Sequence, residues 1–129
     1  MLIEFKNSGL NQMLNERRVL AFNDPSREFQ LYLEDHRNII LATSTKRWLT
    51  YDETELYNYR PVEFLISISY PVSGTWYVLW LNQIKSYMDF KDIEYLYIPN
   101  HKFISSTLYE RFRSELSLLK GNDSKFFED

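Results

Sequence analysis

Four adjacent polar side chains are of the types that transfer protons. Glu34, Asp35, His36 and Arg37 place two carboxylates, an imidazole and a guanidinium in one short stretch, and a positioned imidazole or carboxylate is the usual general acid or base. We expect strands on both sides of this stretch, so it would form a hairpin tip. Hairpin tips are also polar simply because water covers them. Since nothing adjacent would exclude water or shift a pKa, we prefer a solvated tip to an active site.

The other catalytic residue types lack a supporting pattern. His101, the second of two histidines, has no second histidine at metal-site spacing, so we expect no metal and no cofactor. Three glycines cannot form a phosphate-cradling loop, and the absence of cysteine excludes disulfides, thiolate metal sites and cysteine nucleophiles. We therefore expect no catalytic residues and no enzyme. Carboxylates that only the fold could bring together into a hydrolytic pair are Asp52, Glu53, Glu55, Asp89, Asp92 and Glu94.

The stretch 48–59 interleaves aromatic rings with carboxylates and contains no basic residue. Tyr and Trp supply much of the binding energy at protein interfaces, and carboxylates beside them attract a basic partner. A structural interpretation is also open, in which Trp48 and Leu56 belong to the core and the tyrosines edge a sheet. The predicted partner-binding residues are Trp48, Tyr51, Asp52, Glu53, Glu55, Tyr57 and Tyr59.

The first half of the chain predicts two helices and a hairpin that would position these groups. Apolar residues at helical spacing predict a helix over about 8–18. Alternation over 28–34 and an apolar run over 39–43 predict two antiparallel strands joined by the polar tip. Asp52 and Glu55, three residues apart, match a capping box, which favours a short helix over 53–59 that Pro61 would end.

The second half predicts three more strands and a final helix. Residues 62–70 alternate between apolar and other side chains, whereas 75–81 is apolar on both faces and predicts a central strand. Residues 93–98 predict a fifth strand. A helix should follow over about 107–121, ended by Gly121 and covering the sheet with one apolar stripe.

These elements predict an α+β domain, in which an antiparallel sheet of about five strands is flanked by an N-terminal and a C-terminal helix. Residues 1–121 would form this single domain, with 122–129 as a short C-terminal tail. The strand tyrosines cannot all be buried with the aliphatic residues. The sheet therefore either offers an aromatic surface to a partner or curls over a cleft. The residues that would line such a pocket are Tyr70, Trp76, Tyr77, Trp80 and Tyr95.

Charge and hydropathy narrow the classes of partner. The 129 residues hold 15 basic and 18 acidic side chains, a net charge of −3, and no basic cluster larger than a pair. The charge pattern therefore argues against binding to nucleic acid, which depends on clustered Lys and Arg. The longest apolar run is far shorter than the roughly 20 residues of a membrane span, and the first residues lack the pattern of a signal peptide. We expect a soluble, cytoplasmic protein that does not bind membranes.

By elimination, the sequence favours a small protein-binding inhibitor. Such a protein would neutralise a toxin or nuclease by covering its basic active-site groove, as immunity proteins and antitoxins do, and this is an analogy of composition. The partner would be another, basic protein. The alternative is a small-ligand-binding or enzymatic domain that uses the aromatic-lined pocket. A third possibility is self-association through an exposed strand edge.

Overall fold

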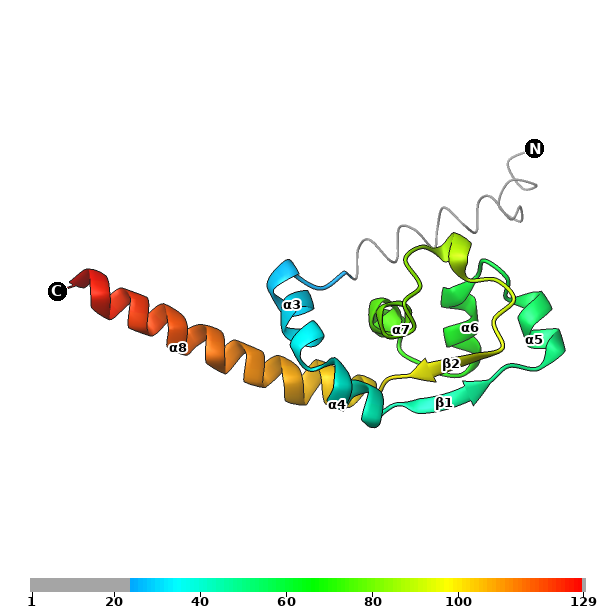
Figure 1. Cartoon of the computed structure of the whole chain (residues 1–129), viewed down its shortest axis with the longest axis horizontal. Helices are drawn as coiled ribbons and strands as arrows, with labels where there is room; N and C mark the ends of the chain where they lie inside the picture. The colour runs from blue at the N-terminus through cyan, green and yellow to red at the C-terminus, as the bar shows by residue number, and fades with distance from the viewer. Residues whose placement is uncertain (1–23, 129) are drawn as a thin grey trace.

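The computed structural model describes residues 24–128, with side chains up to residue 119. This part of the chain contains six α-helices and one two-stranded antiparallel sheet (Figure 1). The expected five-stranded sheet is therefore wrong, and the expected helix over 8–18 lies outside the described residues. No helix in the described part is both long and apolar enough to cross a membrane.

The elements follow one another with short connections. In chain order they are α3 (Arg27–Asp35), α4 (Arg37–Ala42), β1 (Thr45–Trp48), α5 (Tyr51–Leu56), α6 (Pro61–Ser67), the 3-10 helix η1 (Val72–Gly74), α7 (Thr75–Leu81), the 3-10 helix η2 (Tyr87–Asp89), β2 (Tyr95–Ile98), the π-helical η3 (Phe103–Leu108) and α8 (Tyr109–Glu128).

The predicted hairpin over 28–43 is a pair of helices, α3 and α4. Phe29 and Leu33 are buried and lie four residues apart, a spacing that fits both a strand face and a helix face. An N-terminal cap favours the helix, because the Ser26 hydroxyl accepts a hydrogen bond from the Phe29 N–H at 3.2 Å. In α4 only Ile40 is buried, while its apolar neighbours remain exposed.

The predicted strand over 62–70 is the helix α6. Pro61 does not end the preceding helix; it occupies the first turn of α6, where its missing N–H costs nothing. The helix ends in a Schellman arrangement, in which the Tyr70 N–H donates to the Leu65 carbonyl at 2.9 Å. Ser69 takes the left-handed position with a φ of 60°. Glycine usually marks this position, so the sequence carries no visible stop signal.

Replacing Ser69 with Gly should raise the free energy of unfolding by about 0.5–1 kcal/mol, because glycine adopts a positive φ without strain. Urea unfolding of the two proteins measures this gain. The matched control is Ser67→Gly in the last turn of α6, which should lower stability by about the same amount. Equal effects at both positions would contradict the left-handed conformation of Ser69.

The predicted central strand over 75–81 is the helix α7, and it is buried on opposite sides by two apolar clusters. Leu81 belongs to the first cluster, with residues of α3, α4 and η3. Val78 and Leu79 belong to the second cluster, with residues of α6 and β2. A helix that is apolar all round is a buried helix, so the same pattern fits a central strand and a central helix equally well.

The two strands form a ribbon that is anchored to the end of α7. Trp48 of β1 lies opposite Tyr95 of β2, and β2 lies within the predicted strand 93–98. The outer edge of β2 is paired by a side chain: Asn82 accepts from the Tyr97 N–H and donates to the Tyr97 carbonyl, both at 2.8 Å. Asn82 therefore takes the place of a third strand at this position.

The last helix begins and ends elsewhere than predicted. Helical structure starts at His101, after Asn100 has accepted a hydrogen bond from the Phe103 N–H at 3.1 Å. It passes through Gly121 and continues to Glu128. Figure 1 shows α8 extending away from the other elements. Its apolar stripe therefore covers α3 only in its first part, and Leu119 is 62% exposed instead of covering a sheet.

Candidate functional site

Two of the four polar residues expected at a hairpin tip, Glu34 and Arg37, connect α3 and α4 to α7, while the His36 ring lies against Tyr32 of α3. Glu34 accepts a hydrogen bond from the Trp80 indole N–H. Arg37 donates to the Leu81 carbonyl at 2.6 Å and lies over the Trp80 ring, 4.8 Å from its centre. These groups are already used in holding helices together, and the set for proton transfer is not assembled. Within the described residues, no three His, Asp or Glu side chains are grouped as metal ligands.

One face of the ribbon gathers aromatic side chains around a lysine. Because side chains alternate along strands, Lys46 and Trp48 of β1 share this face with Tyr95 and Tyr97 of β2. The Lys46 ammonium lies 4.1 Å from the centre of the Tyr95 ring and 4.6 Å from that of Trp48. The two rings lie 5.0 Å apart. We call these four residues the ribbon face.

The ribbon face continues into α5, and both carry exposed aromatic rings. Trp48 is 61% exposed, Tyr95 39%, and Tyr51, the first residue of α5, 78%. Aromatic side chains held by regular structure lose little conformational freedom on binding, which suits them as anchors. On α5 the carboxylates of Asp52 and Glu55 are exposed as well. Four of the seven predicted partner-binding residues are thus accessible together.

Glu53, another of the seven predicted partner-binding residues, already makes contacts within the fold. Its carboxylate forms a bidentate ion pair with Arg47, at 2.9 and 3.2 Å. It also accepts from the Thr50 N–H, while the Thr50 hydroxyl accepts from the Glu53 N–H, which completes a capping box at the start of α5. The box is therefore formed by Thr50 and Glu53, and not by Asp52 and Glu55 as predicted. Hydrogen bonds from Arg47 and from the Thr50 backbone hold the pKa of Glu53 below its ordinary value.

The pKa of Glu53 predicts a contribution to acid unfolding. The pKa of Glu53 is lower in the folded protein than its ordinary value of about 4.5, so the ionised carboxylate stabilises the fold at any pH above that ordinary value. This stabilisation is lost as the pH falls through the pKa of the folded protein. In Glu53→Gln the free energy of unfolding should therefore fall less steeply as the pH drops below about 4.5, and urea unfolding across the acid range measures this slope. The exposed Glu55→Gln on the same helix is the control, and it should leave the slope unchanged.

The last two predicted anchors, Tyr57 and Tyr59, turn towards the body of the protein. Tyr57 packs against the second cluster, with its ring 5.6 Å from that of Phe64. Tyr59 is half-buried at a φ of 62°, and its N–H donates to the Phe90 carbonyl. The structural interpretation is wrong in its detail, because Tyr57 packs on α6 instead of edging a sheet, and Trp48 and Leu56 are exposed instead of buried in the core. The binding interpretation is left with the residues nearer Trp48.

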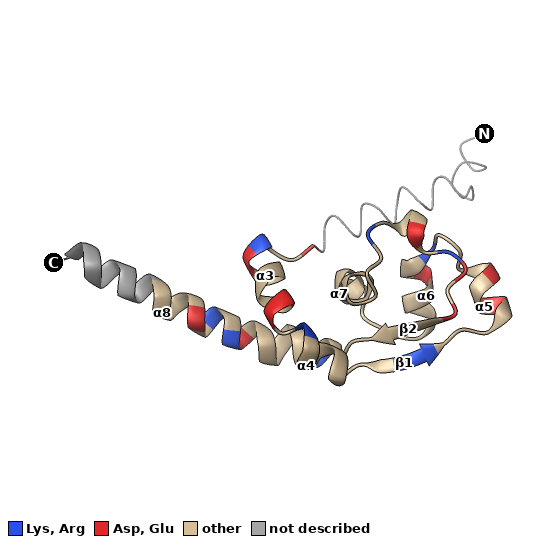
Figure 2. Ribbon diagram, viewed as in Figure 1, with Lys and Arg blue, Asp and Glu red and all other residues tan. Residues whose placement is uncertain are grey.

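Uncompensated negative charge surrounds the aromatic side chains. Figure 2 shows acidic positions on α5 and on the chain that leads into β2, beside the basic end of β1. Asp52, Glu55 and Glu94 are exposed, and the two ion pairs in the described part of the chain involve other residues. The Lys46 ammonium on the ribbon face rests on the aromatic rings. The surface suits a partner that is apolar at its centre and basic around it.

The residues predicted to line one pocket are dispersed to three places. Tyr70 donates from its hydroxyl to the Pro99 carbonyl at 3.0 Å, and burial raises its pKa. Tyr77 packs against the first cluster, where burial also raises its pKa, and Tyr95 lies on the ribbon face. Trp76 and Trp80 remain together, with nearly parallel rings 5.8 Å apart.

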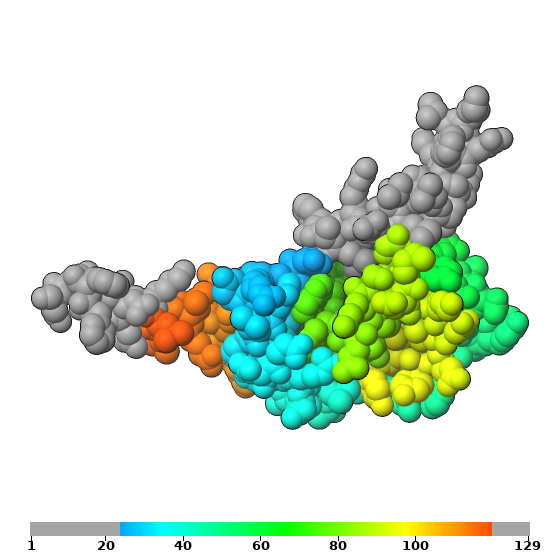
Figure 3. Space-filling model, turned by 45° about the horizontal axis from the view of Figure 1, so that its top comes forward, coloured from blue at the N-terminus to red at the C-terminus, as the bar shows by residue number. Residues whose placement is uncertain are grey.

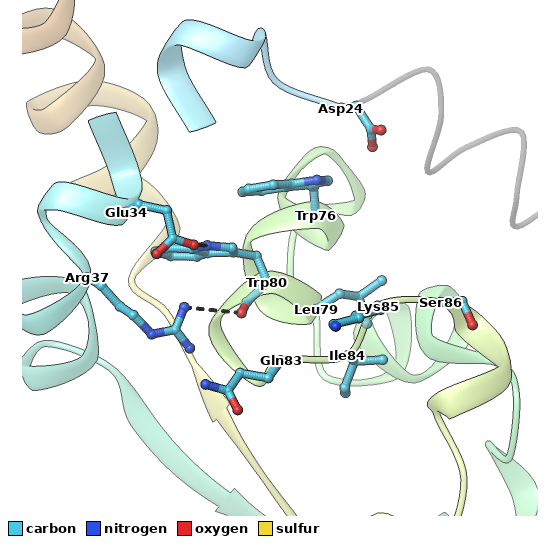
Figure 4. Close-up of a pocket in the computed structure, with 10 residues that line it drawn as sticks. All are labelled: Asp24, Glu34, Arg37, Trp76, Leu79, Trp80, Gln83, Ile84, Lys85 and Ser86. Atoms are coloured by element: carbon cyan, nitrogen blue, oxygen red, sulfur yellow. Dashed lines mark hydrogen bonds between the residues drawn. The ribbon is translucent and has the colours of Figure 1, made fainter. Parts of the chain in front are cut away.

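These two indoles form the wall of a groove with a volume of about 830 Å³, which we call the Trp groove. In Figure 3 the blue surface of α3 and the lime surface of the segment after α7 flank the green surface of α7. Figure 4 shows the side chains around the groove. Its lining residues are Asp24, Glu34, Arg37, Trp76, Leu79, Trp80, Gln83, Ile84, Lys85 and Ser86.

Sequence reasoning did not assign Lys46, Tyr95 and Tyr97 to a partner-binding surface, and it gave Asn82 no role. Tyr95 was assigned to a pocket, and Lys46 to no site, although alternation along 93–98 places Tyr95 and Tyr97 on one face. The sequence did not indicate that these tyrosines pair with β1, because β1 is only four residues long. The role of Asn82 at the edge of β2 could not be predicted from the sequence either, since a single Asn after an apolar run is typical of any turn.

No family model, no curated protein and no solved structure matches this chain. The class is therefore defined by the geometry alone: a small helix-rich domain with one ribbon, an exposed aromatic surface and a separate groove.

Proposed function

We propose that the protein binds another protein through the ribbon face and α5. The observation that carries the proposal is the exposure of three large aromatic side chains, Trp48, Tyr51 and Tyr95, on adjoining regular elements. Exposed aromatic groups of this kind mark interaction sites. The free carboxylates around them favour a basic partner, so the proposed role is that of a cytoplasmic inhibitor that covers a basic groove, as immunity proteins and antitoxins do.

The mechanism combines steric cover with electrostatic attraction. Trp48 and Tyr51 would enter apolar depressions of the partner, and Lys46 would stay on the rings or give up its place to a partner cation. Asp52 and Glu55 would lie at the rim, where charges speed the approach of the partner more than they tighten the complex.

An affinity pull-down from native cell extract, followed by mass spectrometry, tests the proposal. Wild type should retain one stoichiometric basic protein that is lost as salt rises. Truncating Trp48 and Tyr51 to Ala should abolish retention, at about 2 kcal/mol each. Leu31→Ala, which truncates an exposed apolar residue on α3, is the control and should retain the partner. Equal retention by all three proteins, or no partner for wild type, would contradict the proposal.

Once a partner is purified, the carboxylates are tested by kinetics. The double variant Asp52→Asn, Glu55→Gln should associate several-fold more slowly at low salt and show a flatter dependence on salt. Glu53 is left unchanged, because its ion pair and capping box support α5 itself. An unchanged association rate would show that these carboxylates do not speed association, and the proposal would then rest on the aromatic anchors alone.

A further inference from the structure

β1 is the open edge of the ribbon. In Figure 1 β2 lies between β1 and α7, and the Asn82 side chain pairs with the outer edge of β2 at Tyr97. Within the described part of the chain, β2 is the only strand that pairs with β1. Thr45, Lys46 and Trp48 are exposed. Because an exposed strand edge is a template for pairing with another strand, the sheet can be extended at β1.

The hydrogen-bond pattern of the ribbon shows which backbone groups face this edge. The Leu49 N–H donates to the Glu94 carbonyl at 2.9 Å, and hydrogen-bonded pairs alternate along an antiparallel ribbon. Arg47 therefore pairs with β2, whereas the N–H and C=O groups of Lys46 and Trp48 point away from β2. Among the described residues, these four groups have one contact, a long one of 3.5 Å from the Arg47 guanidinium to the Trp48 carbonyl. The edge of β1 thus offers two donors and two acceptors.

The next outward positions along the chain are closed, which limits the edge to these two residues. On one side the Ser44 N–H donates to the Leu41 carbonyl of α4 at 3.1 Å. On the other side the Thr50 N–H donates to the Glu53 carboxylate at 3.0 Å. A strand that pairs with β1 must therefore match an edge of two outward residues, and a second copy of β1 has an edge of the same length.

We propose that two copies of this chain associate through β1, antiparallel and about a two-fold axis at Arg47, to form a four-stranded sheet. Lys46 of each copy then pairs with Trp48 of the other copy, and four hydrogen bonds join the strands. A register that sets Lys46 opposite Lys46 would need the N–H of Ser44. One that sets Trp48 opposite Trp48 would need the N–H of Thr50. Both of these N–H groups are engaged within their own chain, so the register is fixed.

The side chains fit this register. Directly opposite residues lie on the same face of a sheet, with Cβ atoms roughly 5 Å apart, so each Lys46 ammonium meets the second copy's Trp48 ring. It already lies 4.6 Å from the centre of its own Trp48 ring, and a cation is attracted to an indole face. Arg47 meets its counterpart on the opposite face, but Glu53 neutralises each guanidinium in a bidentate ion pair. The two ribbon faces then form one continuous aromatic surface.

Sedimentation equilibrium of the full chain tests the association. A contact of two residues per strand is smaller than a stable dimer interface, so wild type should be monomeric at about 1 µM and form dimers at roughly 100 µM to 1 mM. Lys46→Pro removes an outward N–H but no hydrogen bond to β2, which proline at a strand edge allows, and should abolish the dimer. Lys46→Ala keeps that N–H and should weaken the dimer only a few-fold. A monomeric wild type at the highest concentration, or equal association of all three proteins, would overturn the proposal.

Hydrogen exchange locates the contact without any substitution. The amides of Lys46 and Trp48 face solvent in the monomer and are paired in the dimer, so their exchange should slow several-fold as the protein concentration rises. The Arg47 amide pairs with β2 at every concentration and is the internal control. Association that leaves both outward amides unprotected would contradict a contact through β1.

Single cysteines test the register, because the chain contains no cysteine of its own. At the two-fold axis the Cα atoms of the two Arg47 residues would lie about 4.5 Å apart, which a disulfide can span. Arg47→Cys should therefore give a disulfide-linked dimer under mild oxidation. Thr45→Cys, on the same face of β1, is the control, since it would lie roughly 14 Å from its counterpart and should not cross-link. No cross-link at 47, or equal cross-linking at both positions, would overturn the pairing of Lys46 with Trp48.

Discussion

Replacing Asn82 with Ala should lower the free energy of unfolding by about 3 kcal/mol, measured by urea unfolding. The side chain makes three hydrogen bonds, to the Tyr97 N–H, to the Tyr97 carbonyl and to the Val78 carbonyl. Each is worth about 1 kcal/mol, and the half-buried backbone groups of Tyr97 would lose their partner. The ribbon would keep its inner packing through Leu96 and Ile98.

Two further variants test whether the loss of stability in Asn82→Ala comes from the unpaired edge of β2 or simply from the loss of a side-chain amide. Asn58→Ala removes one exposed hydrogen bond, to the Asp92 N–H, and should cost about 1 kcal/mol or less. Asn82→Asp keeps the acceptor for the Tyr97 N–H but sets a carboxylate against the Tyr97 carbonyl, so it should be nearly as damaging as Ala. If Asn82→Ala and Asn58→Ala cost the same, Asn82 does not substitute for a third strand.

Asn82 also couples the stability of the fold to the proposed interface. Tyr97 lies beside Tyr95 and opposite Lys46, so the residue that Asn82 fixes belongs to the ribbon face. A two-stranded ribbon is marginal in water by itself. Without the amide, Trp48 and Tyr95 would lose the rigid support that makes them suitable anchors. Hydrogen exchange of the strand amides should therefore speed up in Asn82→Ala before exchange in α7 does.

The fold was mispredicted where strand and helix patterns coincide. Residues 62–70 and 75–81 are short and rich in β-branched and aromatic residues, which favours strands locally. Both form helices instead, ended by Ser69 and Gln83 at positive φ. Most residues pay a conformational cost there, and packing of α7 between the two clusters compensates for it. Such compensation comes from tertiary contacts, which short-range sequence patterns do not reveal.

The exposure of part of the candidate site could be predicted from composition, whereas its role in binding stays a prediction. The stretch 48–59 contains Trp48 and Tyr51, which are exposed, and Asp52 and Glu55 beside them. The errors at Glu53 and Tyr57 arise from contacts with Arg47 and Phe64. Those contacts require the ribbon and α6 to be in place.

The corner where η1 meets the start of the last helix carries the second large prediction. Gly74 is buried, and a Cβ atom added to it would lie 2.5 Å from the Cδ2 atom of His101 and 2.8 Å from the Cε1 atom of Tyr70. Both rings have little room to move, since Tyr70 is bonded to the Pro99 carbonyl and His101 packs against Tyr70. Gly74→Ala should therefore cost about 2–3 kcal/mol, as overpacking of a filled interior does.

A double-mutant cycle with His101 assigns this cost to the ring contact. His101→Ala alone should cost about 1–2 kcal/mol of packing, and in its background Gly74→Ala should lose at least half of its effect, because the nearest ring is gone. The neighbouring Ser73→Ala removes one exposed hydrogen bond of 3.4 Å to the His101 ring and should cost about 1 kcal/mol or less. Strict additivity of Gly74→Ala and His101→Ala would mean that the cost arises in the backbone of η1. Coupling would instead show that the His101 ring fills the space beside Gly74, where η1 meets the start of the last helix.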